Sequence, residues 1–168
     1  DLPVLSALCR GYLDGGDRLS ALPLLDRWCA LKPEDAEPLQ LRLEANRKEQ
    51  RNEAALADAL RLQRLRPNYE ELPFTVAGLF FATGEFEEAE NRCREVLDRQ
   101  SGRRDARRLL AECLRARGRR PEAAEVLDAL LREKSDDTAV LLGRGSLYLE
   151  MGEPGPAIPL LEDVIRLD

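Results

Sequence analysis

The side chains that could do chemistry in this chain are four cysteines and many carboxylates and arginines, and histidine is absent. Without histidine there is no histidine general base, no serine–histidine triad and no His-ligated metal site. The chain also lacks a G-x-x-x-x-G-K-[ST] loop for nucleotide phosphates. Acidic pairs such as Glu87/Glu88 are expected on the solvated faces of helices. We therefore expect no catalytic residue, no metal and no cofactor, and we predict that the chain is not an enzyme.

The cysteines at positions 9, 29, 93 and 113 form no C-x-x-C pair of the kind found in zinc and redox motifs. Cys9, Cys93 and Cys113 fall on expected packing faces, which favours small buried hydrophobic side chains in a reducing compartment. The spacing of 20 residues occurs in both 9/29 and 93/113, so a disulfide remains open as an alternative.

Residues 103–120 hold eight arginines, opposed within that span only by Asp105 and Glu112. They could form a binding patch for an acidic or phosphate-bearing partner. The interpretation that we favour is a solvated face whose arginines pair with acids of the preceding segment, such as Glu87, Glu88 and Glu90. The net charge of −6 also disfavours general nucleic-acid binding. The arginines are Arg103, Arg104, Arg107, Arg108, Arg115, Arg117, Arg119 and Arg120.

The elements that must position these side chains show a strict period of 34 residues. Small residues recur at Ala21, Ala55, Ala89, Ala123 and Ala157, and five residues before them stand Gly16, Gln50, Gly84, Gly118 and Gly152. A fixed period of 20–50 residues is typical of repeat architectures. One 34-residue unit is too small to bury a core by itself, so the units are expected to stack.

Within one unit the sequence predicts two helices. In residues 104–137, apolar positions such as Leu110 and Leu114 recur at helical spacing, Gly118 suits a helix C-terminus, and Pro121 suits the first turn of a second helix. The same pattern predicts first helices over 3–14, 36–48, 70–82, 104–116 and 138–150, and second helices over 18–31, 52–65, 86–99, 120–133 and 154–167.

The spacing Leu141-x2-Arg144-Gly145-x2-Tyr148, followed by Ala157-x3-Leu161, resembles the tetratricopeptide repeat family. The second repeat departs most from the family pattern, with Asn46, Gln50 and Ala59 at motif positions. The resemblance implies an all-α, right-handed α-solenoid of helix–turn–helix units, with each periodic alanine where the second helix crosses the first. We expect residues 1–168 to form a single array of five repeats: 2–35, 36–69, 70–103, 104–137 and 138–168.

The resemblance further implies that the first helices line a concave groove for a peptide. The predicted groove residues are Arg10, Gln40, Glu44, Arg47, Phe74, Gly78, Phe81, Arg108, Glu112 and Arg115, with Leu142 and Leu149 in the last repeat. An apolar notch of Phe74, Gly78 and Phe81 between arginines suits a peptide with a bulky apolar anchor and acidic residues. The alternative is that both phenylalanines pack between neighbouring helices, and Phe80 is expected in the core.

Some family members grip a C-terminal carboxylate with Lys, Asn and Arg side chains. At the matching places this chain has Ser6, Arg10, Leu41, Glu71 and Thr75, of which only Arg10 is basic. We therefore do not expect a carboxylate clamp of that kind.

We interpret the chain as a protein–protein interaction scaffold. An accessory substrate-recruiting or assembly domain of a larger enzyme is the alternative, and an RNA- or polyanion-binding repeat is less favoured. The chain has no initiator Met, so we expect a segment of a longer protein. The excess of Arg over Lys suggests a GC-rich bacterial source, and we expect a cytoplasmic protein with no membrane span. We expect a neighbouring molecule or an added segment to cover Ile158, Leu161, Val164 and Ile165 of the last helix, and self-association is one way to do so.

Overall fold

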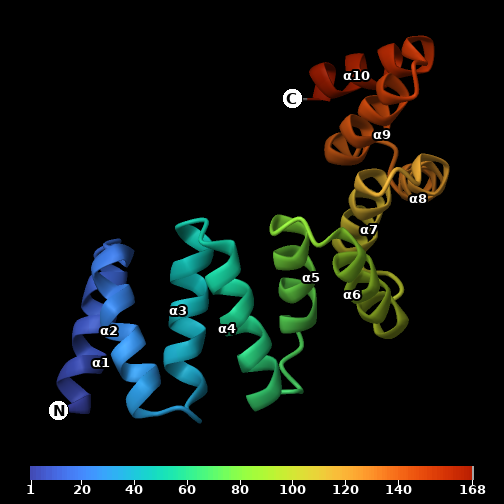
Figure 1. The fold of residues 1–168 in the computed structure, drawn as a ribbon. Helices are drawn as coiled ribbons and strands as arrows, with labels where there is room; N and C mark the ends of the chain where they lie inside the picture. Colours follow the sequence, from blue (N-terminus) through green and yellow to red (C-terminus); the bar gives the residue numbers. More distant parts are fainter. Residues whose placement is uncertain (168) are drawn as a thin grey trace. The chain divides into compact units, whose positions relative to one another are not determined.

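In the computed structural model, residues 1–167 are described, and they form ten α-helices joined by short turns, with no strand among them (Figure 1). The helices are α1 (Leu2–Asp14), α2 (Arg18–Leu31), α3 (Ala36–Lys48), α4 (Asn52–Leu65), α5 (Leu72–Ala82), α6 (Phe86–Arg99), α7 (Arg104–Ala116), α8 (Arg120–Glu133), α9 (Thr138–Glu150) and α10 (Pro154–Leu167). The predicted all-α class is confirmed.

The predicted helix boundaries are confirmed except at two N-termini. Helix α1 begins at Leu2 instead of residue 3, and α5 begins at Leu72 instead of residue 70. The delay in α5 follows from Pro73 in its first turn. A helix beginning at residue 70 would need an N–H at position 73 to donate to the Tyr69 carbonyl, and proline has none. That carbonyl instead accepts from the Leu72 N–H, which closes a turn before the helix.

The chain divides into two compact units, Asp1–Thr83 and Gly84–Asp168, which fall on either side of the turn inside the third predicted repeat. In the first unit, α1 to α4 each pack against the helix that follows, ending with α4 against α5. In the second unit, α6 to α10 pack in the same consecutive manner, and α7 also contacts α9. First helices of successive repeats are therefore neighbours in the second unit.

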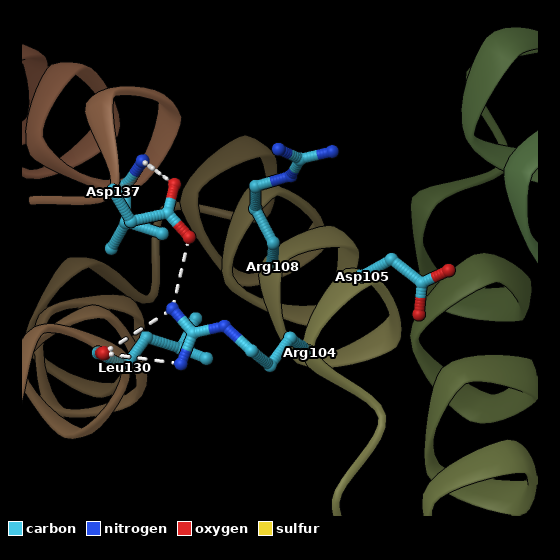
Figure 2. Close-up of a pocket in the computed structure, with 6 residues that line it drawn as sticks. Arg104, Asp105, Arg108, Leu130 and Asp137 are labelled. Carbon is cyan, nitrogen blue, oxygen red and sulfur yellow. Dashed lines mark hydrogen bonds and ion pairs between the residues drawn. The ribbon is translucent and has the colours of Figure 1, made fainter. Parts of the chain in front are cut away.

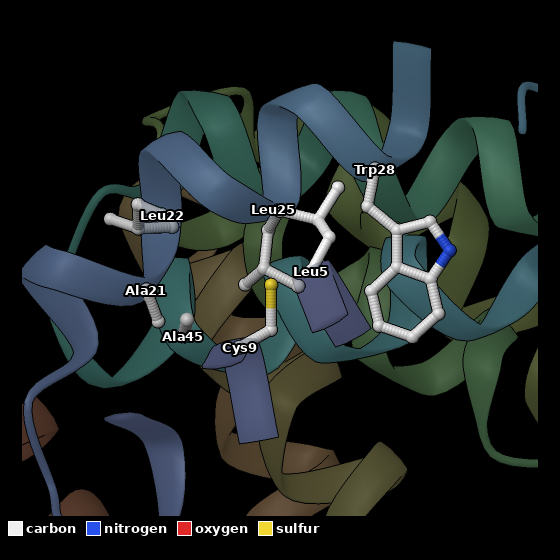
Figure 3. Close-up of a cluster of buried hydrophobic side chains, with 7 residues drawn as sticks. All are labelled: Leu5, Cys9, Ala21, Leu22, Leu25, Trp28 and Ala45. Atoms are coloured by element: carbon white, nitrogen blue, oxygen red, sulfur yellow. The ribbon is translucent and has the colours of Figure 1, made fainter. Parts of the chain in front are cut away.

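The periodic alanines lie in the tightest part of each repeat. Ala21, Ala55, Ala89, Ala123 and Ala157 are each fully buried. Figure 3 shows Ala21 in the first core, together with Cys9, Leu25 and Trp28. In the last repeat, a side chain added at Gly145 of α9 would come within 2.8 Å of Leu161 on α10. Small residues are thus required where the paired helices approach most closely.

The apolar face of the last helix is less exposed to solvent than the sequence predicts. Leu161 and Val164 are half-buried, because α10 packs on α9 with Leu161 against Gly145. Ile158 and Ile165 are exposed, as expected. The prediction that another molecule covers this face is not tested.

The turn between the two helices of a repeat uses a left-handed residue. Gly16, Gly84, Gly118 and Gly152 have φ between 76° and 85°, and Gln50 occupies the same place with φ of 55°. In the second repeat, the Arg51 N–H donates to the Asn46 carbonyl at 2.8 Å, which satisfies a carbonyl at the end of α3. The turn geometry is therefore retained where glycine is missing.

All four cysteines are free and buried, which favours the interpretation as small core side chains over a disulfide. Cys29 is buried as well, although the sequence pattern did not place it on a packing face. A hydrogen bond with Cys113, together with burial, raises the pKa of Cys93 and keeps this thiol protonated.

One ion pair between successive repeats occurs at the same place in both units. On α3, the Arg42 guanidinium donates to Asp26 of α2 at 2.7 Å and to Asp58 of α4 at 2.5 Å. On α9, Arg144 donates to Asp128 of α8 at 2.7 Å. In each case the arginine follows the aspartate of the preceding repeat by 16 residues. This arginine ties the first helix of one repeat to the second helix of the repeat before it.

A buried carboxylate holds the α7–α8 turn to α6. Glu90 is only 3% exposed and accepts hydrogen bonds from Arg94 at 2.8 Å, Arg117 at 2.5 Å and Arg119 at 2.7 Å. Burial raises the pKa of Glu90, but the hydrogen bonds from the three arginines outweigh burial and hold that pKa below its ordinary value of 4.5.

We predict that Ala123→Leu destabilises the protein by about 1–3 kcal/mol more than Ala124→Leu. Ala123 is fully buried on α8, whereas the adjacent Ala124 is half-buried and has room to shift. Urea denaturation followed by circular dichroism measures the difference. Equal midpoints for the two variants would contradict the placement of Ala123 at the helix crossing.

We predict that Gln50→Gly stabilises the protein by roughly 0.5–1 kcal/mol. Left-handed backbone costs a non-glycine residue about 1–2 kcal/mol, and the greater entropy of an unfolded glycine offsets part of the gain. The reciprocal change, Gly118→Gln, is expected to destabilise the equivalent turn in the fourth repeat. The same denaturation assay tests both variants, and a destabilised Gln50→Gly protein would show that this side chain has a compensating contact.

We predict that Glu90→Gln destabilises the protein near neutral pH by about 1.5–3 kcal/mol, because hydrogen bonds to a charged group are lost. The folded-state pKa of Glu90 lies below the unfolded value. Its stabilising contribution is therefore present above pH 4.5 and is lost as the pH falls through the folded-state pKa. The gap in unfolding free energy between wild type and variant should narrow with acidification. Glu88→Gln, at an exposed position on α6, is the control and should change little.

Candidate functional site

The charged groove residues predicted for the first two repeats already have ion-pair partners. Arg10 on α1 pairs with Glu37 of α3, which raises the pKa of Arg10, and its guanidinium lies 5.8 Å from the Trp28 ring centre. On α3, Arg47 pairs with Glu44 at 3.1 Å. Gln40 on the same helix is half-buried. The charges on this stretch are thus already compensated within the first unit.

The aromatic part of the predicted groove lies on α5. Phe74, Gly78 and Phe81 are half-buried, whereas Phe80 is buried and belongs to the core as predicted. A side chain at Gly78 would enter open space, because no neighbouring heavy atom lies within 4 Å of the position that a Cβ would occupy there. Because Arg108 and Arg115 belong to the other unit, the predicted flanking of this notch by arginines stays a prediction.

In the second unit, the predicted stripe on α7 lies beside α9. Arg115 donates to Glu112 at 2.6 Å and to Glu150 of α9 at 2.7 Å. Glu112 also lies 3.6 Å from the side-chain position of Gly143 on α9. Farther along α9, Leu142 and Leu149 are each about half exposed, at 50% and 51%. A charged helix and a helix with exposed leucines thus form one face.

Within the described residues, seven of the eight arginines in 103–120 have an ion-pair partner. The predicted pairing with the preceding segment is confirmed for Glu87 and Glu90, which both contact Arg117. The remaining pairs are Arg103–Asp105, Arg104–Glu133 and Arg104–Asp137, Arg107–Glu133, Arg115–Glu112 and Arg115–Glu150, Arg119–Glu90 and Arg119–Glu122, and Arg120–Glu150. This compensation favours an ion-paired face over a patch for polyanions.

Arg108 is the exception, since the described residues offer it no ion-pair partner. Its exposed side chain lines a cavity of about 220 Å³ with Arg104, Asp105, Leu130, Asp137 and Val140. Figure 2 shows Arg104 donating to Asp137 at 2.9 Å, while the Arg108 guanidinium makes no such bond to the residues drawn. An uncompensated guanidinium can donate two parallel hydrogen bonds to a carboxylate or phosphate.

Sequence reasoning placed Arg108 on the groove stripe but missed the residues that shape its surroundings. Asp137 caps α9 by accepting from the Val140 N–H and also accepts from Arg104. Burial raises the pKa of Asp137, but its hydrogen bonds outweigh this effect and lower the pKa overall. Because Asp137 stays ionised, Arg104 is held in place and Arg108 remains available.

Other classes of site find no support in the part of the chain that the structure describes. No group of three or more Cys, Asp or Glu side chains there is arranged to hold a metal ion. No helix among residues 1–167 has both the length and the apolar character needed to cross a bilayer.

Comparison with known proteins finds a family match for part of the chain and a shared fold for nearly all of it. The family model for the tetratricopeptide repeat matches residues 80–147. No curated protein sequence matches the chain. Among solved structures, MamA from Desulfovibrio magneticus RS-1 is 16% identical with a TM-score of 0.83, covering 99% of this chain and 94% of MamA. A tetratricopeptide repeat protein from Parabacteroides merdae is 22% identical with a TM-score of 0.83, covering 99% of this chain and 65% of that one. The protein YrrB is 14% identical with a TM-score of 0.75, covering 100% and 87% respectively.

At these identities the solved structures establish a shared fold. The family match over residues 80–147, together with this fold, supports a general role in protein–protein interaction. Residues 80–147 thus match the tetratricopeptide repeat family in sequence, and nearly the whole chain shares its fold with solved tetratricopeptide repeat proteins.

Proposed function

We propose that this protein is a scaffold whose first helices bind a partner peptide carrying an acidic group next to a bulky apolar side chain. The observation that carries the proposal is Arg108, an exposed guanidinium with no ion-pair partner among the described residues, beside a cavity of about 220 Å³. A cation that the fold leaves uncompensated gains more from a partner's carboxylate than one already paired.

The apolar part of the proposed peptide is suggested by α9. Leu142 and Leu149 expose about half of their surface on the helix that contacts α7. Exposed leucines side by side with an uncompensated cation match a partner segment that has apolar and acidic residues within one or two turns. The other predicted groove residues of α7, Glu112 and Arg115, pair with each other and would position the peptide instead of neutralising it.

The aromatic stripe on α5 supports a second contact point in the first unit. Gly78 leaves open space between the positions of Phe74 and Phe81, which suits insertion of an apolar side chain. Arg10, Gln40, Glu44 and Arg47 complete the proposed surface of this unit. The neighbour YrrB is described as having an unusual peptide-binding site, and peptide binding on a related fold agrees with the proposal.

Selection from a random 12-residue peptide library on the wild-type protein tests this function. We expect selected peptides to combine Asp or Glu with Leu, Ile or Phe, and Arg108→Ala to weaken their binding by about tenfold, as expected for loss of a charge-assisted hydrogen bond. Fluorescence anisotropy of the labelled peptides gives the dissociation constants. Arg132→Ala, at an exposed arginine on α8 that does not line the cavity, is the matched control.

The outcome that would overturn the proposal is a set of peptides without acidic residues, or binding that is equal for wild type and Arg108→Ala. Phe74→Ala/Phe81→Ala separates the two contact points. Unchanged affinity for this double variant would remove α5 from the binding surface and leave α7 and α9.

A further inference from the structure

The fourth repeat carries Arg107 where the first, second and last repeats carry the buried residues Leu5, Leu39 and Leu141, and the third carries Pro73. Arg107 extends its guanidinium to Glu133, with hydrogen bonds of 2.6 and 3.0 Å. The buried leucine of three repeats is therefore replaced in the fourth by an ion-paired arginine.

An open cleft of about 400 Å³ lies beside Arg107. Its apolar lining comes from three helices of the second unit: Leu97 of α6, Leu110 of α7, and Val126 and Ala129 of α8. Arg107, Glu125 and Ser101 complete the lining. The space is nearly twice the volume of the cavity beside Arg108, and a leucine or phenylalanine side chain fits within it.

The cleft is separate from the proposed peptide groove. Its α7 residues are Arg107 and Leu110, whereas the groove stripe on α7 consists of Arg108, Glu112 and Arg115. Successive residues of a helix point about 100° apart, so the two sets project from different sides of α7.

The charged residues around the cleft indicate which kind of partner segment it would bind. The Arg107 guanidinium is compensated by Glu133. Glu125 is exposed and has no ion-pair partner among the described residues, so it is the uncompensated charge of the lining. A carboxylate beside an apolar cleft complements a partner that presents an apolar side chain next to a cation.

We propose that the cleft between α6, α7 and α8 binds a basic, apolar segment of a partner protein. A side chain of leucine or phenylalanine size enters the space that Arg107 leaves open, and a Lys or Arg within one helical turn pairs with Glu125. The fourth repeat thereby offers two surfaces of opposite preference: Arg108 selects acidic segments, and Glu125 selects basic ones.

Arg107→Leu tests the cleft directly, because it introduces the residue type of the first, second and last repeats. Peptides selected from the random 12-residue library on the Arg108→Ala protein, in which the acidic-peptide surface is impaired, should combine Lys or Arg with Leu, Ile or Phe. Arg107→Leu, combined with Arg108→Ala, should raise the urea midpoint by filling the cleft and weaken these peptides at least tenfold. Ala129→Gln, which places a neutral polar side chain in the apolar lining, should weaken them to a similar extent at a nearly unchanged midpoint. Arg132→Ala, on the same helix outside the cleft, should have no effect.

Charge reversal tests the role of Glu125. Glu125→Arg should weaken the basic peptides by up to about fivefold, the size expected of an exposed ion pair, and should favour variants of the same peptides in which Lys or Arg is replaced by Glu. Anisotropy measured in 0.05 and 0.5 M NaCl should show the charge preference fading at high salt.

Three results would overturn the inference. They are selection of no peptide on Arg108→Ala, selection of peptides without basic residues, and binding that survives both Arg107→Leu and Ala129→Gln. Loss of the acidic class with Arg108→Ala and loss of the basic class with Arg107→Leu are independent observations, so failure of one surface leaves the test of the other intact.

Discussion

The close crossing of two helices in every repeat is the constraint on which the rest of the structure depends. A side chain larger than alanine at Ala21, Ala55, Ala89, Ala123 or Ala157 would meet the partner helix, and all five are fully buried. Because the small residue must return at the same place, the period stays at 34 residues and the turns stay equal in length. The fixed period in turn decides which residues of each first helix face outward together.

This constraint explains why most of the fold could be predicted from the sequence. The alanine and glycine series fixed the phase of the helices, so eight of ten N-termini fall where the pattern places them. The start of α5 was missed because a local effect, Pro73, overrides the period. Cys29 was missed because it lies beyond the positions at which the repeat requires burial in every unit.

The electrostatic contacts were harder to predict, because long side chains reach partners that depend on rotamers and on neighbouring helices. The arginine cluster showed that many charges must be compensated, but nothing in the sequence separated Arg108 from the seven arginines that found partners. One signal was available: Asp26 and Arg42 stand 16 residues apart, as do Asp128 and Arg144 three repeats later. Because this aspartate–arginine pair recurs at the same place in the 34-residue period, it indicates a contact between neighbouring repeats. The structure has one such contact in each unit.

In a repeat protein of this kind, function depends on the residues that differ from the repeat pattern. The type of each difference decides whether it affects stability, packing or charge. Where Gln50 replaces glycine, the turn keeps its shape, so the departure affects stability more than surface chemistry. Where Arg107 stands in place of the buried leucine of three other repeats, it pairs with Glu133 and lines an open cleft. The adjacent Arg108 changes charge without changing packing. Two neighbouring residues on one helix thus alter the repeat in different ways, one through volume and the other through charge, and each leaves the underlying framework unchanged.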